Sequence, residues 1–401
     1  MKKNILFIYH VSSFGGGSYC LLNIIRKLDK SMFNPIVLLK NEGPLSHELE
    51  RRGVTVHLEG GLSTVPYNRG LFKRGALRQV LKVMFSLRKV RKWIYKTQAD
   101  IVHINTMMMY PYVFPARKLD RKVVVHVREH WPKGENIFQF KLARRLIVDF
   151  SNKIVAINKE SADMIACPEK TVIVYDWIDF SNRQELIDLS SRLGANDDKV
   201  KTLLYLGGFQ KIKGALEVVN MFSKRLRQDD LRLLFVGSDD KRFETKGFRA
   251  IIKAVLRMYG MPVYSDKVRE LAQKDDRIVF IAANNNVKSL LDQSFCLVSF
   301  FTKPHANLAV AEAAWLGVPS VAARTPESVE YCAEDNNSSL LFEINNENEF
   351  VKALVYAIEN EDEIYANAYE KIPEIRRKFD SNRNSTLLNE AYRELFGNKF
   401  I

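Results

Sequence analysis

The sequence of 401 residues contains few cysteines and no long apolar run. Its four cysteines are far apart, with no CxxC pair and no histidine cluster beside them: Cys20, Cys167, Cys296 and Cys332. This spacing argues against a disulfide framework or a structural zinc site and fits a reducing cytosol. No window approaches the roughly 18 apolar residues that a membrane-spanning helix requires. The opening MKKNILFIYHVSSF has only a short apolar run, which ends at His10, and no small-residue cleavage site. We interpret it as a first strand and not as a signal peptide.

Acidic residues are missing from one long segment. Between Gly60 and Ala99 there is no Asp or Glu, but there are ten Lys or Arg. The net charge of +14 comes from the same half of the chain: residues 1–185 hold 31 Lys and Arg against 16 Asp and Glu, and the remainder holds 30 against 31. Such a bias favours a basic face for an anionic membrane or a polyanion, with an unevenly charged solvated surface as the alternative.

The basic segment has an apolar side. Five apolar residues recur at helical spacing in residues 79–96 and predict a stripe that packs on a sheet: Val80, Met84, Leu87, Val90 and Ile94. The preceding loop, PYNRGLFKRG, mixes apolar and cationic residues in a way that suits an anionic lipid surface. The membrane candidates are Arg69, Phe72, Lys73 and Arg74. A solvated charged helix is the alternative, and nucleic acid is disfavoured because the aromatic residues are not spaced as a stacking platform.

The order of apolar segments predicts an α/β protein with two Rossmann-like domains. Unbroken apolar strands such as NILFIYHV and DIVHIN alternate with helical segments, and the pattern repeats from TLLYLGGF onward. We expect an N-terminal domain over residues 1–180, a hinge over 181–199 and a C-terminal domain over 200–382. A last helix within 383–401 should pack back on the first domain. Ligands of such sheets bind at the carboxyl ends of the strands, so we expect the domains to face each other across a cleft.

The first glycine-rich motif is FGGGS, residues 14–18, between a strand and a helix. Gly16 and Gly17 let the backbone approach a ligand, and the helix N-terminus offers free N–H groups to an anion. A plain tight turn is the alternative. A dinucleotide-binding turn is excluded because the GxGxxG spacing is absent and the next strand lacks an acidic end.

The second motif is LGGFQKIKG, residues 206–214, again between a strand and a helix. Lys211 and Lys213 lie beside the helix N-terminus. A fixed cation there suits a diphosphate whose negative charge grows as it leaves. A solvated lysine is the alternative.

The third motif, PHANLAVAEAAWLGVPSVAA at residues 304–323, is the most specific. Glu312 opens an alanine-rich helix, where its carboxylate can accept hydrogen bonds from two ribose hydroxyls. His305 lies seven residues earlier and could face the sugar or the phosphates. The alternatives are a helix-dipole partner for Glu312 and a hydrogen-bonded structural role for His305.

A polar cluster follows a strand in VHVREHW, residues 125–131. We assign Arg128, Glu129 and His130 to orientation of an acceptor, with a structural ion pair as the alternative. His103, at the end of DIVHIN, is a weaker candidate of the same kind.

These motifs together resemble family 4 of the retaining glycosyltransferases, which have the GT-B fold. The resemblance covers nearly the whole chain. Its further elements are the Gly-x-x-x-x-x-Lys-Gly turn that ends at Gly214, the pair Val236 and Gly237, the Glu-Ala-x-x-x-Gly-x-Pro run from Glu312 to Pro319, and the Pro and Glu of 326–330.

The resemblance implies roles for single residues. Gly16 and Gly17 would lie beside the donor phosphate and the acceptor, Lys213 would contact the diphosphate, and Glu312 would hold the ribose. The remaining donor-binding candidates are Gly208, Lys211, Gly237, Asn307 and Leu308. Two positions depart from the family pattern: Pro304 stands where the first of two paired glutamates is found, and Gly208 where an Arg is common. The departures put in question how the hydroxyls of the donor sugar are recognised. Lys211 could replace the Arg.

We therefore expect transfer of a hexose-type residue from a nucleoside diphosphate sugar, with retention, to a saccharide or lipid-linked saccharide. The setting would be bacterial surface polysaccharide synthesis at the cytoplasmic face of a membrane. No cofactor or metal is expected, because no Asp-x-Asp pair ends a strand in the cleft. A GT-B-like nucleotide-sugar epimerase and a non-catalytic sugar-binding or membrane-associated homologue are the alternatives. The sequence does not set the base, the sugar, the linkage, the acceptor or the oligomeric state.

Overall fold

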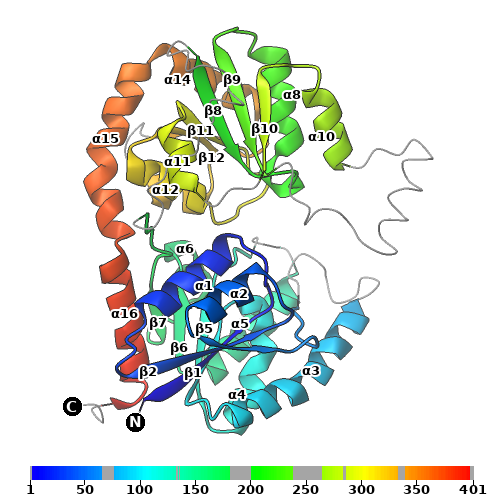
Figure 1. Cartoon of the computed structure of the whole chain (residues 1–401), viewed down its shortest axis with the longest axis vertical. Helices are drawn as coiled ribbons and strands as arrows, with labels where there is room; N and C mark the ends of the chain where they lie inside the picture. The colour runs from blue at the N-terminus through cyan, green and yellow to red at the C-terminus, as the bar shows by residue number, and fades with distance from the viewer. Residues whose placement is uncertain are drawn as a thin grey trace. The chain divides into compact units, whose positions relative to one another are not determined.

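The computed structural model describes residues 2–65, 76–131, 134, 136–180, 200–237, 264–282, 286–332 and 339–397. The chain divides into two compact units, Met1–Trp177 with Phe379–Ile401, and Ile178–Lys378. Each is an α/β domain built on one parallel sheet, as the sequence predicts (Figure 1). The expected hinge, residues 181–199, lies outside the described residues. So do the four expected membrane residues Arg69, Phe72, Lys73 and Arg74.

The sheet of the first unit has the strand order β3-β2-β1-β4-β5-β6-β7, and every neighbouring pair among its described strands is parallel. The strands are β1 (Lys3–Tyr9), β2 (Phe33–Leu39), β3 (Thr55–Leu58), β4 (Ile101–Ile104), β5 (Lys122–Val127), β6 (Lys153–Ala156) and β7 (Thr171–Ile173). The order reverses between β1 and β4, which leaves a crevice at the carboxyl ends of these two strands.

Helices cover both faces of this sheet. They are α1 (Gly16–Lys27), α2 (Pro44–Arg51), α3 (Ala76–Lys96), η1 (Met107–Tyr112), α4 (Val113–Lys118), α5 (Ile137–Phe150), α6 (Lys159–Ile165) and α16 (Ser381–Glu394). Alternate residues of β1 enter two different cores, because successive side chains of a strand point to opposite faces. Ile5 and Phe7 pack with α1, α2 and α16, whereas Leu6 and Ile8 pack with α3, η1, α4 and α5. Apolar residues on both faces explain the unbroken apolar runs of the sequence.

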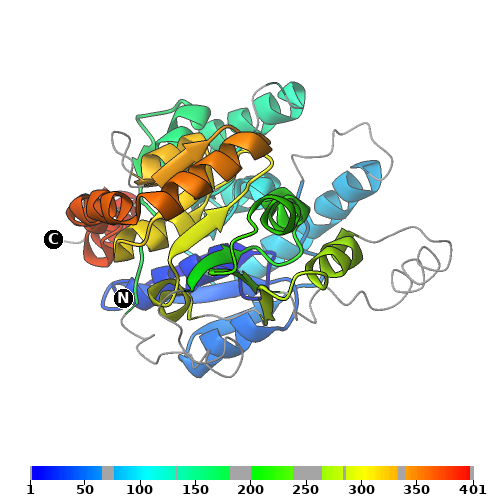
Figure 2. The same cartoon turned by 90° about the horizontal axis from the view of Figure 1, so that it is seen from above.

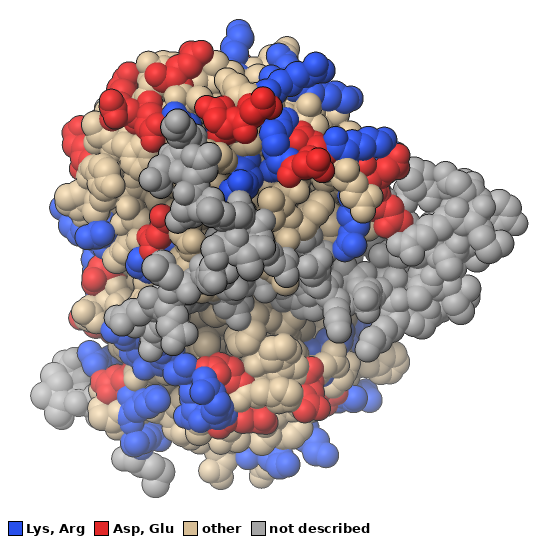
Figure 3. Space-filling model, turned by 45° about the horizontal axis from the view of Figure 1, so that its top comes forward, with Lys and Arg blue, Asp and Glu red and all other residues tan. Residues whose placement is uncertain are grey.

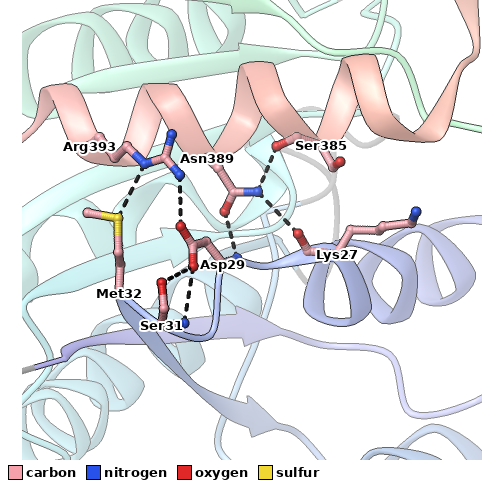
Figure 4. A network of polar contacts seen from close by, with 7 residues as sticks. All are labelled: Lys27, Asp29, Ser31, Met32, Ser385, Asn389 and Arg393. Atoms are coloured by element: carbon pink, nitrogen blue, oxygen red, sulfur yellow. Dashed lines mark hydrogen bonds and ion pairs between the residues drawn. The ribbon is translucent and has the colours of Figure 1, made fainter.

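The last helix, α16, belongs to the first unit. Its Asn389 accepts from the backbone N–H of Asp29 at 3.0 Å and donates to the carbonyl oxygen of Lys27 at 3.1 Å. Arg393 adds an ion pair with Asp29 at 2.7 Å (Figure 4). Tyr392 is fully buried beneath the helix. These contacts fix the end of the chain to the end of α1.

The second unit repeats the architecture, with the strand order β10-β9-β8-β11-β12-β13. Its strands are β8 (Lys201–Leu206), β9 (Leu231–Val236), β10 (Ile278–Ile281), β11 (Cys296–Ser299), β12 (Ser320–Ala323) and β13 (Ser339–Phe342). Its described helices are η2 (Lys211–Lys213), α8 (Ala215–Arg225), α10 (Tyr264–Ala272), α11 (Val287–Asp292), α12 (Leu308–Leu316), α13 (Pro326–Cys332), α14 (Glu347–Glu359) and α15 (Glu361–Lys378). One core joins the sheet to α8, α10 and α14 and the other joins it to α11, α12 and α13, so helices again cover both faces (Figure 2).

The buried stripe of α3 differs from the predicted one. Val83, Val90 and Ile94 are buried, at intervals of seven and four residues. Met84, expected in the stripe, is 58% exposed, because it lies one helical step of about 100° from Val83. None of the described helices combines the length and apolarity that crossing a bilayer requires.

Candidate functional site

The second unit has its switch point between β8 and β11, which are neighbours in the sheet but not consecutive in the chain. The loops that follow these two strands leave a crevice at their carboxyl ends. The β8 loop carries Lys211 and Lys213, and the β11 loop carries His305 and leads into α12. The two most specific sequence motifs therefore meet at one edge of one sheet.

The β8 loop is fixed by its own strand. The Tyr205 hydroxyl donates to the carbonyl oxygens of Gly208 at 3.3 Å and Lys213 at 3.2 Å. Gly214 follows with φ of +69°, and a Cβ there would lie 2.2 Å from the Phe300 carbonyl oxygen. Only glycine allows η2 to turn into α8 so close to the end of β11.

Lys213 is drawn inward by this turn. Its Nζ donates to the carbonyl oxygen of Leu206 at 3.3 Å. Burial lowers the pKa of Lys213 below its ordinary value, and attraction to the Glu312 carboxylate opposes that shift. Lys211, by contrast, is exposed. The structure therefore brings Lys213 and Glu312 within electrostatic reach of each other.

Glu312 lies one turn further into its helix than the sequence indicated. α12 begins at Leu308, after the N-cap Asn307, so Glu312 is the fifth helical residue. The field of a helix end falls off within its first turn, which weakens the alternative of a dipole partner. The Asn307 side chain, another donor-binding candidate, is buried and donates to Ser299 Oγ at 2.7 Å. It anchors the start of α12 to β11.

The loop that carries His305 packs on the β8 loop. The Thr302 backbone N–H and hydroxyl donate to the Ile212 carbonyl oxygen at 2.9 and 3.3 Å. His305 is half-buried, and its ring lies 5.5 Å from that of Phe301. The two hydrogen bonds of Thr302 fix the start of the loop that carries His305 to η2.

In the first unit, the glycine-rich loop follows β1 at the switch point. α1 starts at Gly16, and Ser18 closes the turn by donating to the Ser13 carbonyl oxygen at 2.7 Å. A Cβ on Gly16 would meet no atom within 4 Å, whereas one on Gly17 would lie 2.5 Å from the Tyr9 hydroxyl. Gly16 thus offers open backbone, whereas a side chain at position 17 would require Tyr9 to shift.

Arg128 follows β5 and is nearly enclosed. Its guanidinium donates to both carboxylate oxygens of Asp176 at 2.6 Å and to Asn105 Oδ1 at 3.3 Å. Burial opposes its charge, but Asp176 reverses the effect, and the pKa of Arg128 is raised. Arg128 thus forms a structural ion pair, which was the alternative for this cluster. The pair with Asp176 links the segment after β7 to the segment after β5.

Glu129 is held by the loop after β4. Thr106 Oγ1 donates to its carboxylate, as do the backbone N–H groups of Met107 at 3.0 Å and Arg128 at 3.2 Å. Burial raises the pKa of Glu129, and these three donors oppose the rise. Glu129 therefore orders the edge of the sheet between β4 and β5. His130, beside it, is buried.

His103 lies inside the domain. It is the third residue of β4, is fully buried, and accepts or donates a hydrogen bond with the Tyr392 hydroxyl of α16 at 2.8 Å through Nδ1. Burial, followed by repulsion from Arg128, lowers its pKa to about 3. His126, on the neighbouring strand, is also buried, with a pKa well below the usual value.

The sequence argument missed the partners of this cluster, namely Asn105, Thr106, His126 and Asp176. Asn105 and Thr106 directly follow β4, as Arg128 and Glu129 follow β5. Polar residues after two neighbouring strands were a usable signal. The pairing of Asp176 with Arg128 spans 48 residues and had no local signal.

Two family models match the chain. The model described as Glycosyltransferase Family 4 matches residues 14–182. The model described as Glycosyl transferases group 1 matches residues 200–360. The chain belongs to glycosyltransferase family 4. In this family 4 glycosyltransferase, the first matched range falls largely in the first unit and the second in the second unit.

Two curated relatives match parts of this family 4 glycosyltransferase. It is 23% identical over 206 residues to N-acetyl-alpha-D-glucosaminyl L-malate synthase of Bacillus anthracis, covering 50% of this chain and 48% of that one. It is 24% identical over 250 residues to the UDP-N-acetylglucosamine–N-acetylmuramyl-(pentapeptide) pyrophosphoryl-undecaprenol N-acetylglucosamine transferase of Staphylococcus carnosus, covering 61% and 64%. The chain thus spans less than two thirds of the length of these relatives.

Solved structures match over nearly the whole chain. Anabaena HepE in complex with UDP and glucose has a TM-score of 0.73 at 17% identity, covering 97% of this chain and 99% of that one. A Listeria monocytogenes structure named for a UDP-N-acetylglucosamine 2-epimerase has a TM-score of 0.62 at 12% identity, covering 99% and 97%. These likenesses establish the GT-B fold for the family 4 glycosyltransferase.

Proposed function

We propose that this protein transfers a hexose-type residue from a nucleoside diphosphate sugar to a saccharide or lipid-linked saccharide, with retention at the anomeric carbon. The proposal rests on the electrostatic attraction between Lys213 and Glu312, whose segments follow β8 and β11 at the switch point. A cation and a carboxylate at this edge match the two ends of a nucleoside diphosphate, which has a charged diphosphate and a neutral ribose.

In the proposed reaction, the bond between the anomeric carbon and the diphosphate oxygen breaks, and its electron pair leaves with the diphosphate. Lys213 stabilises the growing negative charge. The acceptor hydroxyl forms the new bond to the anomeric carbon on the same face of the sugar, and its proton passes to a donor phosphate oxygen. A partly desolvated cation stabilises the charge of the diphosphate more strongly than a solvated one does, because water screens it less.

The remaining residues bind and orient. Glu312 accepts hydrogen bonds from the ribose, and the loop with His305, Asn307 and Leu308 contacts the donor. The open backbone at Gly16 receives the acceptor. Arg128 and Glu129 act as positioning residues on the acceptor side. Both side chains already form hydrogen bonds within the protein.

We further propose that the enzyme works at the cytoplasmic face of a membrane in bacterial surface polysaccharide synthesis. The excess of basic residues in the first 185 residues supports this setting. So does the relative whose name includes a pyrophosphoryl-undecaprenol acceptor.

The first test is a thermal-shift screen with UDP- and GDP-sugars, because a bound donor stabilises the fold by mass action. The donor that binds is then incubated with and without saccharide acceptors, and products are followed by NMR. We expect a glycoside with retained anomeric configuration only when acceptor is present. No metal is part of the proposal, so a chelator should leave the rate unchanged.

A nucleotide-sugar epimerase is the second candidate, because the fold is shared with a structure named for one. An epimerised nucleotide sugar formed from donor alone would overturn the transferase proposal. Absence of binding to every nucleotide sugar would instead favour a non-catalytic role.

A further inference from the structure

Large exposed apolar side chains are concentrated on two helices of the first unit. Ten such side chains are exposed among the described residues of the whole chain. Six of these ten lie in the N-terminal halves of α3 and α5: Leu81, Met84, Phe85, Ile137, Phe138 and Leu142. Phe85 is 71% exposed and Phe138 is 70% exposed. Scattered exposed apolar residues need no explanation, but a concentration on two helices does.

The two helices begin at the same edge of the sheet. α3 follows β3, α5 follows β5, and each leads into the next parallel strand, so both begin at the carboxyl edge. Both pack against α4 and η1 on the same face. α3 has 21 residues, about 31 Å in length, whereas β4 has four, about 13 Å in length. Its N-terminal half therefore projects past the carboxyl edge (Figure 1).

The surroundings of the apolar residues are basic. The outward face of α3 carries Arg78, Lys82 and Arg88, and the described helix contains no acidic residue. α5 carries the exposed Lys141 and Arg145, and its one acid, Asp149, is at the far end, where it pairs with Arg145 at 3.5 Å. On the face drawn in Figure 3, acidic and basic side chains are interspersed. Charge alone therefore does not distinguish a binding region on that face. What distinguishes α3 and α5 is that exposed apolar residues lie among basic ones.

We infer that the N-terminal halves of α3 and α5 form a docking surface for an anionic lipid bilayer. Phe85, Met84 and Phe138 would enter the boundary between headgroups and acyl chains, and the surrounding Lys and Arg would contact lipid phosphates. The cationic side chains around the apolar residues suit phosphate headgroups and repel a second copy of the same basic surface. The inference deepens the membrane part of the proposed function and places it on residues other than those that the sequence favoured.

The test is flotation of the full chain with vesicles of phosphatidylcholine alone or of equal parts phosphatidylcholine and phosphatidylglycerol. We expect binding to the anionic vesicles only. Phe85→Gln and Phe138→Gln should each weaken binding about tenfold, because each removes a buried apolar side chain from the complex. Lys82→Gln should weaken it about fivefold, an effect that high salt abolishes.

The matched control is Tyr95→Gln. Tyr95 is also 71% exposed and lies on the same helix, but at its C-terminal end. The Tyr95→Gln variant should bind anionic vesicles as strongly as the wild type does. Equal losses for Tyr95 and Phe85, or flotation with neutral vesicles alone, would overturn the inference. So would a dimer in analytical ultracentrifugation that Phe85→Gln dissociates, because the occupant would then be a second copy.

The inference and the proposed function can fail separately. Donor binding is measured on the same variants by thermal shift, and none of the substituted residues belongs to the donor site. Unchanged donor binding with no flotation would reject the membrane surface alone. Flotation without binding of any nucleotide sugar would reject the transferase alone.

Discussion

Gly208 and Gly237 hold the loops after β8 and β9 in direct backbone contact. A Cβ on Gly208 would lie 2.8 Å from the carbonyl oxygen of Gly237, and both residues have positive φ, +54° and +95°. The Gly208 N–H also donates to the Val236 carbonyl oxygen at 2.9 Å. The position where the family commonly has an Arg is therefore closed to side chains in this protein.

We predict that Gly208→Arg destabilises the second unit and does not raise activity. A side chain at this φ costs about 1–2 kcal/mol, and relief of the Cβ contact adds to it, so a loss of about 2 kcal/mol or more in the free energy of unfolding is expected. Urea denaturation measures the loss. Gly16→Ala is the control, because its Cβ meets open space and should cost under about 0.5 kcal/mol. A Gly208→Arg enzyme that is as stable as wild type and more active would contradict the account.

A second prediction concerns Lys213 and Glu312 as a pair. Lys213→Met should lower kcat by about 10²–10³-fold, because it removes charge stabilisation of the leaving diphosphate. Glu312→Gln should act mainly on the KM for the donor. In the double variant the two losses should fall short of additivity by about 0.5–3 kcal/mol, since the groups interact. Lys211→Met, at an exposed position, is the control and should change kcat little. Full additivity would mean that the two groups act independently.

The fold was predictable because apolar periodicity is local. The strands of the first sheet are mostly apolar segments, and their alternation with helices identified a parallel sheet covered on both faces. The position of the segments that carry Lys213 and Glu312, after β8 and β11, was predictable for a similar reason, since the carboxyl ends of these strands border the crevice. Whether these two residues act as proposed was not predictable from position alone.

Other features depend on contacts between distant segments. The sequence gives no local sign that Asp176 pairs with Arg128, or that Tyr392 reaches His103 across 289 residues. In the stripe predicted for α3, Val90 and Ile94 are buried as expected, but Val83 is buried in place of Met84. Both residues are apolar, and the core beneath the helix decides between them. The exposed residues of α3 and α5 likewise became visible only once the buried ones were known.

A third prediction is the pH dependence of catalysis. Burial lowers the pKa of Lys213 below the 10.5 of an ordinary lysine. As pH rises through this lowered pKa, the side chain loses the charge that the diphosphate needs, so kcat/KM should fall on the alkaline side at a lower pH than an exposed lysine would cause. Lys213→Arg should move this limb upward, because arginine stays charged. Lys211→Arg is the matched control. An alkaline limb that does not move in Lys213→Arg would assign it to another group.

The fourth prediction is acid sensitivity of the first unit through His103. This side chain is fully buried, and its folded pKa of about 3 lies well below the 6.5 of an ordinary histidine. Between these pH values the unfolded chain binds a proton that the folded chain excludes, so the stabilisation is complete above pH 6.5 and is lost as pH falls toward 3.

His103→Asn should be less stable at neutral pH, because the fit beneath Tyr392 is lost. Its stability should also fall less steeply with acid, by up to about 1.4 kcal/mol per pH unit, which corresponds to one proton. The buried His126 remains in the variant and keeps part of the slope. Urea denaturation over this pH range measures both effects, with the exposed His47→Asn as control. An unchanged slope in His103→Asn would show that the buried ring is not what makes the unit sensitive to acid.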